Sequence, residues 1–184
     1  MKYISCVLSI LLFTSSFSAS AQPSEPSPAA RIKSFDVWVG DWTLTGTAKD
    51  GPSMPEYKAT WKLHGTRILG GAFIRVDQVW QGPGPALRGL EILYYDSIKK
   101  ALSSSVFFSD GSTVAGTAIF EGLTSIATGS ITAPDGSVVH WRINWVLSPD
   151  RMSITGTQEV EQDGNKWTGF SMKGTKAQDS AKKK

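Results

Sequence analysis

The feature that most constrains the fold is a succession of short segments in which apolar and polar residues alternate. In one of them, Tyr57, Ala59, Trp61 and Leu63 are separated by polar residues. Alternation with a period of two is typical of a β-strand that buries one face. About ten such segments follow one another between residues 41 and 174, at the spacing of roughly 8–12 residues found in β-barrels and β-sandwiches.

The connections between these segments are short and carry turn residues. Pro-Asp-Gly stands at 134–136, Ser-Pro-Asp at 148–150 and Gln-Asp-Gly-Asn at 162–165, which are residues that hairpins require. Residues 68–80 are expected to form one long strand with a bend at its glycines. No amphipathic helix of ordinary length intervenes, so consecutive strands should pair antiparallel. We predict an all-β fold, a single up-and-down β-barrel of about ten strands, with a β-sandwich as the alternative.

The residues before the first strand predict a short helical turn. Phe35, Trp38 and Val39 have the i, i+3, i+4 spacing that places side chains on one face of a helix. Gly40 can end the turn, because glycine enters left-handed backbone at little cost. Trp42 then begins the period-two alternation. We therefore expect the turn to close one end of the barrel.

The same stretch carries a family resemblance. Gly40 and Trp42 form a Gly-x-Trp motif on the first strand, and residues 89–96 end in a Tyr-Asp pair before a glycine-punctuated β tail. This order resembles the calycin group, lipocalins and nitrobindin-like proteins, and within it a secreted bacterial barrel family of unknown function. The resemblance covers roughly residues 31–175 and implies a barrel fold. It also implies an arginine stacked on Trp42, for which Arg151 is the candidate.

Residues 1–21 have the composition of a signal peptide. Lys2 precedes a short apolar run, and the small residues at 19–21 fit a cleavage site. The apolar run is too short to span a bilayer. We predict cleavage before Gln22 and an exported protein, periplasmic or secreted. Cys6 is the single cysteine of the chain, so the mature protein would contain no disulfide.

The remaining boundaries follow from composition. Residues 22–30 are rich in proline and should form an extended leader, and residues 176–184 should form a disordered basic tail. The domain would then span residues 31–175. The formal net charge of +3 is concentrated in the tail, so the body is close to neutral. We therefore predict no nucleic-acid partner and no stable membrane insertion, and leave the oligomeric state open.

The apolar faces of the strands define an expected barrel interior rich in aromatic residues. Such a lining suits a small hydrophobic or amphipathic ligand. The seven tryptophans of the chain could equally fill the barrel as a solid core, and both alternatives stay open at this point. The predicted interior, and thus candidate ligand-binding, residues are Trp42, Tyr57, Trp61, Ile74, Ile92, Tyr94, Phe108, Trp141, Trp145 and Met172.

Three polar residues are candidates for a polar part of the pocket, namely Arg75, His140 and Arg142. The apolar-inward rule places them outside. If their strands turned the other way, His140 and Arg142 would form a polar cluster able to bind a carboxylate. A buried arginine must be paired, so Asp77, Glu91 or a ligand anion would then have to lie beside it.

The sequence contains few groups for metal or cofactor chemistry. Its two histidines, His64 and His140, are far apart, so we predict no metal site. Nitrobindin-like relatives can hold haem through a late-strand histidine, but no matching motif surrounds His140, and we predict no cofactor. Hydrolase, phosphate-loop and dinucleotide-binding motifs are missing, and no catalytic residue is assigned.

Three hypotheses for function remain. The leading one is a non-enzymatic exported barrel that binds a small hydrophobic or amphipathic molecule. The second is an isomerase or cyclase on the same barrel, acting on a lipid-like substrate with His140, Arg142 or Tyr94 as acid–base groups. The third is a filled barrel that acts through surface contacts with other proteins.

Overall fold

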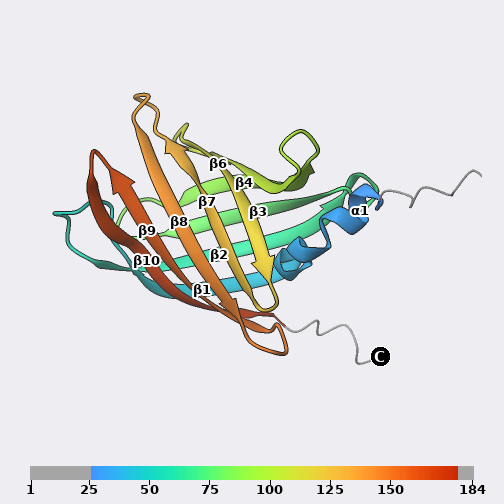
Figure 1. Cartoon of the computed structure of the whole chain (residues 1–184). Coiled ribbons are helices and arrows are strands. Elements are labelled where there is room, and N and C mark those ends of the chain that lie inside the picture. The colour runs from blue at the N-terminus through green and yellow to red at the C-terminus, as the bar shows by residue number, and fades with distance from the viewer. Residues whose placement is uncertain (1–25, 178–184) are drawn as a thin grey trace, which may run out of the picture.

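The protein is a closed antiparallel β-barrel of ten strands (Figure 1). The computed structural model describes residues 26–177. Each strand pairs with its neighbours in sequence, and β1 closes the barrel against β10. The predicted up-and-down barrel is confirmed, and closure rules out the sandwich. The strands are β1 (Gly40–Ala48), β2 (Tyr57–Ile68), β3 (Phe73–Gln81), β4 (Leu87–Asp96), β5 (Ala101–Phe108), β6 (Thr113–Glu121), β7 (Thr124–Thr132), β8 (Val138–Leu147), β9 (Ser153–Gln162) and β10 (Asn165–Lys176).

Two short helices close one end of the barrel and are called the plug below. They are α1 (Pro28–Arg31) and the 3₁₀-helix η1 (Lys33–Trp38), and they pack beside the barrel end in Figure 1. Phe35 is buried and meets the ring of Phe120 edge-on at 5.4 Å between centroids. The predicted helical turn is thus confirmed, with 3₁₀ geometry.

Trp42 joins the plug to the barrel. Its side chain is 1% exposed, and its indole Nε1 donates a hydrogen bond of 2.9 Å to the carbonyl of Val37. The cation over its ring is Lys176, whose Nζ lies 5.8 Å from the centroid. The expectation that Arg151 stacks there is wrong, since Lys176 occupies this position and Arg151 lies in the β8–β9 turn.

Part of the predicted leader is helical. Residues 28–31 are helical rather than extended, because Pro28 has a φ suited to the first helical turn and the Ser27 hydroxyl accepts a 3.3 Å hydrogen bond from the Ala30 amide. The predicted signal peptide, the first residues of the leader and most of the basic tail lie outside the described residues.

The predicted long strand over residues 68–80 is shorter, because its first residues form a turn and the strand β3 begins only at Phe73. The 3₁₀ turn η2 (Leu69–Gly71) separates β2 from β3, with Gly70 and Gly71 at φ of 65° and 85°. Left-handed backbone at two successive glycines reverses the chain instead of bending a strand. Ile68 therefore ends β2, and the rest of the apolar run belongs to β3.

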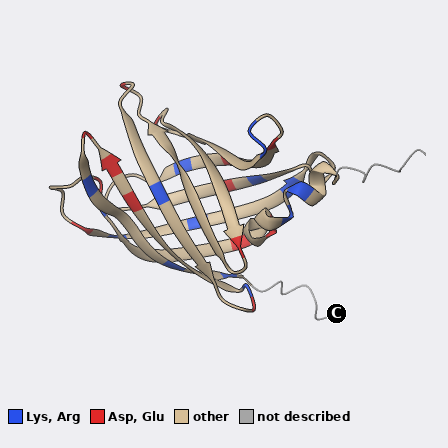
Figure 2. Cartoon of the chain, viewed as in Figure 1, with Lys and Arg blue, Asp and Glu red and all other residues tan. Residues whose placement is uncertain are grey.

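Strand polarity gives the barrel two distinct ends. Since β1 starts at the plug, the β1–β2, β3–β4, β5–β6, β7–β8 and β9–β10 connections all lie at the opposite end, called the mouth below. Basic and acidic positions are interspersed along the strands and loops in Figure 2. No helix among residues 26–177 has the length and apolar character needed to cross a membrane.

Candidate ligand cavity

Two cavities that share part of their lining occupy the barrel interior. The upper cavity has a volume of about 370 Å³ and is bordered at the mouth by loop residues such as Asp50 and Ser112. The lower cavity is about 80 Å³ and is bordered by Phe35 and Trp38 of the plug. The residues that line both cavities are called the waist, and they are Trp61, Glu91, Ser104, Trp141 and Ile143.

Aromatic rings form one wall of the upper cavity. The Trp61 ring lies 5.8 Å from that of Trp80 and 6.0 Å from that of Phe170. Phe170 is in turn 5.8 Å from Trp145, and Trp145 is 5.3 Å from Trp38 of the plug. The aromatic set therefore runs from the plug towards the mouth, and tilted or edge-on contacts of this kind hold the rings in fixed orientations.

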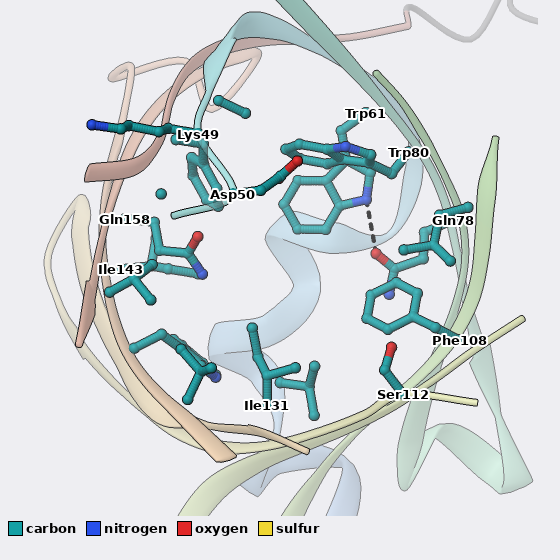
Figure 3. A pocket seen from close by; sticks show the side chains of 18 of the residues that line it. Lys49, Asp50, Trp61, Gln78, Trp80, Phe108, Ser112, Ile131, Ile143 and Gln158 are labelled. Atoms are coloured by element: carbon teal, nitrogen blue, oxygen red, sulfur yellow. Dashed lines mark hydrogen bonds between the residues drawn. The ribbon is translucent and has the colours of Figure 1, made fainter. Parts of the chain in front are cut away.

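Gln78 orients Trp61 at this wall. Its Oε1 accepts a 2.7 Å hydrogen bond from the indole Nε1 of Trp61, drawn as the dashed line in Figure 3. Gln78 is 3% exposed, and its Nε2 has no partner among the described residues. A buried donor without a partner costs roughly 1–3 kcal/mol, so an amide here is expensive for a barrel that only needs to pack.

Trp141 lies against the opposite wall, where two glycines make room for it. A Cβ at Gly116 or Gly129 would stand 2.8 Å from ring atoms of Trp141, which is closer than real side chains approach. The two glycines pair with each other on β6 and β7. The indole Nε1 of Trp141 is another buried donor without a described partner.

Glu91 is the acidic residue of the waist. Its cross-strand partners Val76 and Val106 are both buried, so its side chain points into the barrel with them. No hydrogen bond or ion pair joins its carboxyl to another described residue, and burial raises the pKa of this carboxyl to about 7. The Glu91 side chain is half-buried in the barrel interior, and it borders both cavities.

Positive charge is nearly missing from the lining. Among the described residues, Lys49 is the one Lys, Arg or His that borders either cavity. It belongs to the β1–β2 loop at the mouth, and its amino group points away from the cavity in Figure 3. The interior thus carries one unpaired acid and no base near it.

Two side-chain hydrogen bonds hold the β1–β2 loop in place at the mouth. The Tyr57 hydroxyl donates a 2.6 Å hydrogen bond to the Asp50 carboxylate, and the Trp167 indole donates to the carbonyl of Lys49 at 3.1 Å. Burial first, and the hydrogen bond and charge of Asp50 next, raise the pKa of Tyr57 to about 12. These contacts keep the entrance in a defined shape.

The structure distributes the predicted interior residues over four environments, namely the upper cavity, the lower cavity, the packed core and the outer face. Tyr57, Trp61, Phe108 and Trp141 line the upper cavity, and Trp145 lines the lower one. Trp42, Ile74 and Met172 are at most 2% exposed, belong to the packed core and line neither cavity. The barrel is therefore partly solid near the plug and hollow towards the mouth.

Ile92 and Tyr94 are placed on the outer face, contrary to the prediction. Tyr94 pairs across the strands with Phe73, and their rings lie 6.3 Å apart. The apolar-inward rule failed in β4 because both of its faces carry large apolar residues. The inward face is the one interrupted by Gly89 and Glu91, since a Cβ at Gly89 would meet the side chains of Gln78 and Phe108 at 2.9 and 2.8 Å.

The polar candidates all lie outside the barrel. Arg75 pairs with Asp77 at 2.7 Å on the outer face of β3, and His140 and Arg142 are exposed on β8. The alternative in which their strands turn them inward is wrong. The isomerase or cyclase hypothesis therefore loses its acid–base residues, because Tyr94 is outside as well.

Residues that the sequence reading missed provide the polar part of the cavity. They are Gln78, Ser104 and Gln158, together with Glu91, which was named only as a possible partner of a buried arginine; Trp80 was also overlooked as a lining residue. One signal was available for Glu91, which is the single charged residue between Leu90 and Tyr95 in a strand of apolar residues. A charged residue in such a strand indicates either an exposed edge strand or a buried polar site.

Comparison with known proteins agrees with this architecture. Residues 27–176 match the family described as "Protein of unknown function (DUF1579)". The chain belongs to this family. The family match spans the plug and all ten strands, so the cavity lies wholly inside the family domain.

Several solved structures are similar in fold, and among them is "Crystal Structure of Rv2717c from M. tuberculosis". It matches with a TM-score of 0.60 and 12% sequence identity over 84% of this chain and 100% of that chain. At that identity the likeness is one of fold alone. No curated protein matches the sequence, and residues 26–177 contain no group of three or more His, Cys, Asp or Glu suited to a metal ion.

Proposed function

We propose that this barrel binds a small hydrophobic or amphipathic molecule in the upper cavity, entering through the mouth. The observation that carries the proposal is an aromatic-lined cavity of about 370 Å³ whose deep end contains an unpaired carboxyl. Ligand cavities typically have volumes of about 300–1,000 Å³ and combine apolar walls with a few polar groups. A barrel that only packed against itself would gain stability by filling this space with side chains.

The unpaired donors support the same proposal. Gln78 and Trp141 keep polar atoms at the cavity wall that an all-apolar lining would not need. Isolated buried polar groups are rare in proteins and often mark a functional site. The ordered mouth, with Tyr57 bonded to Asp50, is in keeping with an entrance of fixed shape.

The binding test uses a neutral environment-sensitive probe, N-phenyl-1-naphthylamine, and a cavity-filling variant. Ile131 lines the upper cavity (Figure 3), so Ile131→Trp should occupy the space and abolish the saturable rise in probe fluorescence. The matched control is Ile119→Trp, because Ile119 is 67% exposed on the neighbouring strand. Both variants are first compared with the wild type by circular dichroism and thermal unfolding.

Two results would count against ligand binding. The first is a folded Ile131→Trp variant that takes up the probe with unchanged affinity. The second is protein from its own host that shows a bare polypeptide mass in native mass spectrometry and takes up no probe afterwards. Together they would favour the third hypothesis, a barrel that works through its surface. A stoichiometric small molecule recovered by solvent extraction would support the proposal and identify the ligand.

We further propose that the protein works after export, on the basis of the signal-like residues 1–21. The test is amino-terminal sequencing of the protein recovered from the periplasmic and culture fractions. A mature chain that begins at Gln22 in either fraction supports export. Full-length protein confined to the cytoplasmic fraction contradicts it.

A further inference from the structure

We propose that the molecule held at the waist is an amphipathic amine, whose ammonium group pairs with Glu91 beside the rings of Trp61 and Trp141. This inference rests on the proposed function, since it names the ligand class for the same cavity. It begins from the charges of the lining. The titratable residues that border either cavity are Glu91, at the waist, and Lys49, Asp50 and Tyr57, at the mouth.

The first argument is that Glu91 lacks a partner. A buried carboxyl is usually compensated by an Arg, a Lys or several hydrogen bonds. Among the described residues, no Arg or Lys lines the cavities beside Glu91, and no hydrogen bond reaches its carboxyl. The inward residues next to it are Val76 and Gln78 on β3, Ser104 and Val106 on β5, Trp61 on β2 and Trp141 on β8, and none of them carries a charge. A cation brought by a ligand would supply the missing partner.

The second argument is the aromatic surroundings. Trp61 and Trp141 line the waist together with Glu91. Trp141 contacts the glycines of β6 and β7 and also borders both cavities. The electron-rich faces of tryptophan rings attract ammonium groups, and more strongly when water is excluded. An acid among aromatic rings is therefore a site that favours amines over other polar groups.

The third argument concerns anions. A fatty acid or another carboxylate would place its negative charge beside Glu91 in a region of low dielectric, where like charges repel strongly. The one cation of the lining, Lys49, is at the mouth and points away. The lining therefore selects against carboxylates, and an apolar alcohol would gain the aromatic contact without the ion pair.

The proposal predicts a specific dependence on pH. An alkylammonium ion stays charged up to about pH 10, whereas Glu91 titrates near neutrality and pairs with the cation only when ionised. Amine affinity should therefore rise as the pH increases towards 7 and level off above it, with release of a proton from Glu91 on binding. The other acidic groups of the lining, Asp50 and Tyr57, are hydrogen-bonded to each other at the mouth, on the loop side of the cavity.

The experiment compares three molecules with the same number of carbon atoms, n-octylamine, octan-1-ol and sodium octanoate, by isothermal titration calorimetry on residues 22–184. At pH 8 we expect octylamine to bind about tenfold more tightly than octan-1-ol, and octanoate to bind weakest. Between pH 5.5 and 7 the octylamine affinity should increase. Calorimetry in two buffers of different ionisation enthalpy counts the protons released.

Two variants separate the ion pair from the general apolar contact. Glu91→Gln should lower octylamine affinity about tenfold at pH 8, remove its pH dependence and leave octan-1-ol binding in place. Glu159→Gln, an exposed acid on the outer face of β9, should change none of these values. Circular dichroism and thermal unfolding confirm that both variants fold.

The possible failures are distinguishable. If octan-1-ol or octanoate binds as tightly as octylamine at pH 8, or if Glu91→Gln keeps full octylamine affinity, the amine inference is wrong and the proposed function stands. If none of the three molecules binds and the neutral naphthylamine probe is also excluded, the proposed function and this inference both fall.

Discussion

Glu91 should make the empty barrel less stable as the pH rises. The pKa of its carboxyl is about 7 in the folded protein, against an ordinary value of 4.5. The folded state therefore holds this proton more tightly than the unfolded chain does. The contribution of Glu91 to the free energy of unfolding is greatest below pH 4.5, decreases as the pH rises from 4.5 to 7, and stays at its low value above pH 7.

The size of the effect follows from the two pKa values. A difference of this size corresponds to about 3 kcal/mol in the free energy of unfolding, as an upper value, because water that enters through the mouth will solvate the carboxylate. Replacement by glutamine removes the titration and keeps the shape of the side chain. The quantity to compare is the free energy of unfolding of Glu91→Gln minus that of the wild type. We expect the pH-dependent part of this difference to be near zero at pH 4 and to increase by up to about 3 kcal/mol at pH 8.

The assay is urea unfolding of both proteins at several pH values between 4 and 8, followed by tryptophan fluorescence. Other carboxylates titrate in both proteins, so the difference between the two curves isolates Glu91. Glu159→Gln is the control, since an exposed acid should give a difference within about 0.5 kcal/mol at every pH. A Glu91→Gln difference that is the same at pH 4 and pH 8 would refute the reasoning, because it would mean that the carboxyl is well solvated in the folded state.

Two further predictions concern the packed and the ordered parts of the barrel. Gly156→Ala should destabilise the protein by about 1–3 kcal/mol, because a Cβ there would stand 2.0 Å from the Trp145 ring. The control is Gly84→Ala, since a Cβ at Gly84 would have nothing within 4 Å. Equal melting temperatures for the two variants would contradict the packing of Gly156 against Trp145. Asp50→Asn should lower the pKa of Tyr57 from about 12 towards its ordinary value, although burial will keep this pKa raised. Ultraviolet difference titration near 295 nm measures the pKa. An unchanged midpoint would show that Asp50 does not raise the pKa of the Tyr57 hydroxyl.

The position of Glu91 explains why a cavity of this kind is hard to read from sequence. Apolar alternation assigns the face of a strand by the weight of its apolar side chains, and in β4 the outward face, with Leu90, Ile92 and Tyr94, has the greater weight. The inward face combines Leu87 and Leu93 with Gly89 and Glu91. Local rules are expected to fail where a chain keeps a polar group for function.

The neighbouring strands decided the orientation of β4. In β3 the inward positions Val76 and Gln78 pair directly with Glu91 and Gly89, and Gln78 is fixed by its bond to Trp61. A shift of one residue would reverse both faces of β4. It would also bring a Cβ into the space that Gln78 and Phe108 occupy above Gly89.

The sequence alone determined the all-β class, the number of strands, the antiparallel order and the plug, because these depend on local alternation and on turn residues within short stretches of chain. It also placed Trp61, Trp141 and Trp145 correctly, since their strands have one clearly apolar face. Tertiary structure alone decided that the barrel is solid near the plug and hollow towards the mouth, and that Gln78 and Glu91 face the hollow. Those properties arise from how ten strands close around a common axis, where rings and glycines from distant strands meet, and no local pattern encodes the volume they leave between them.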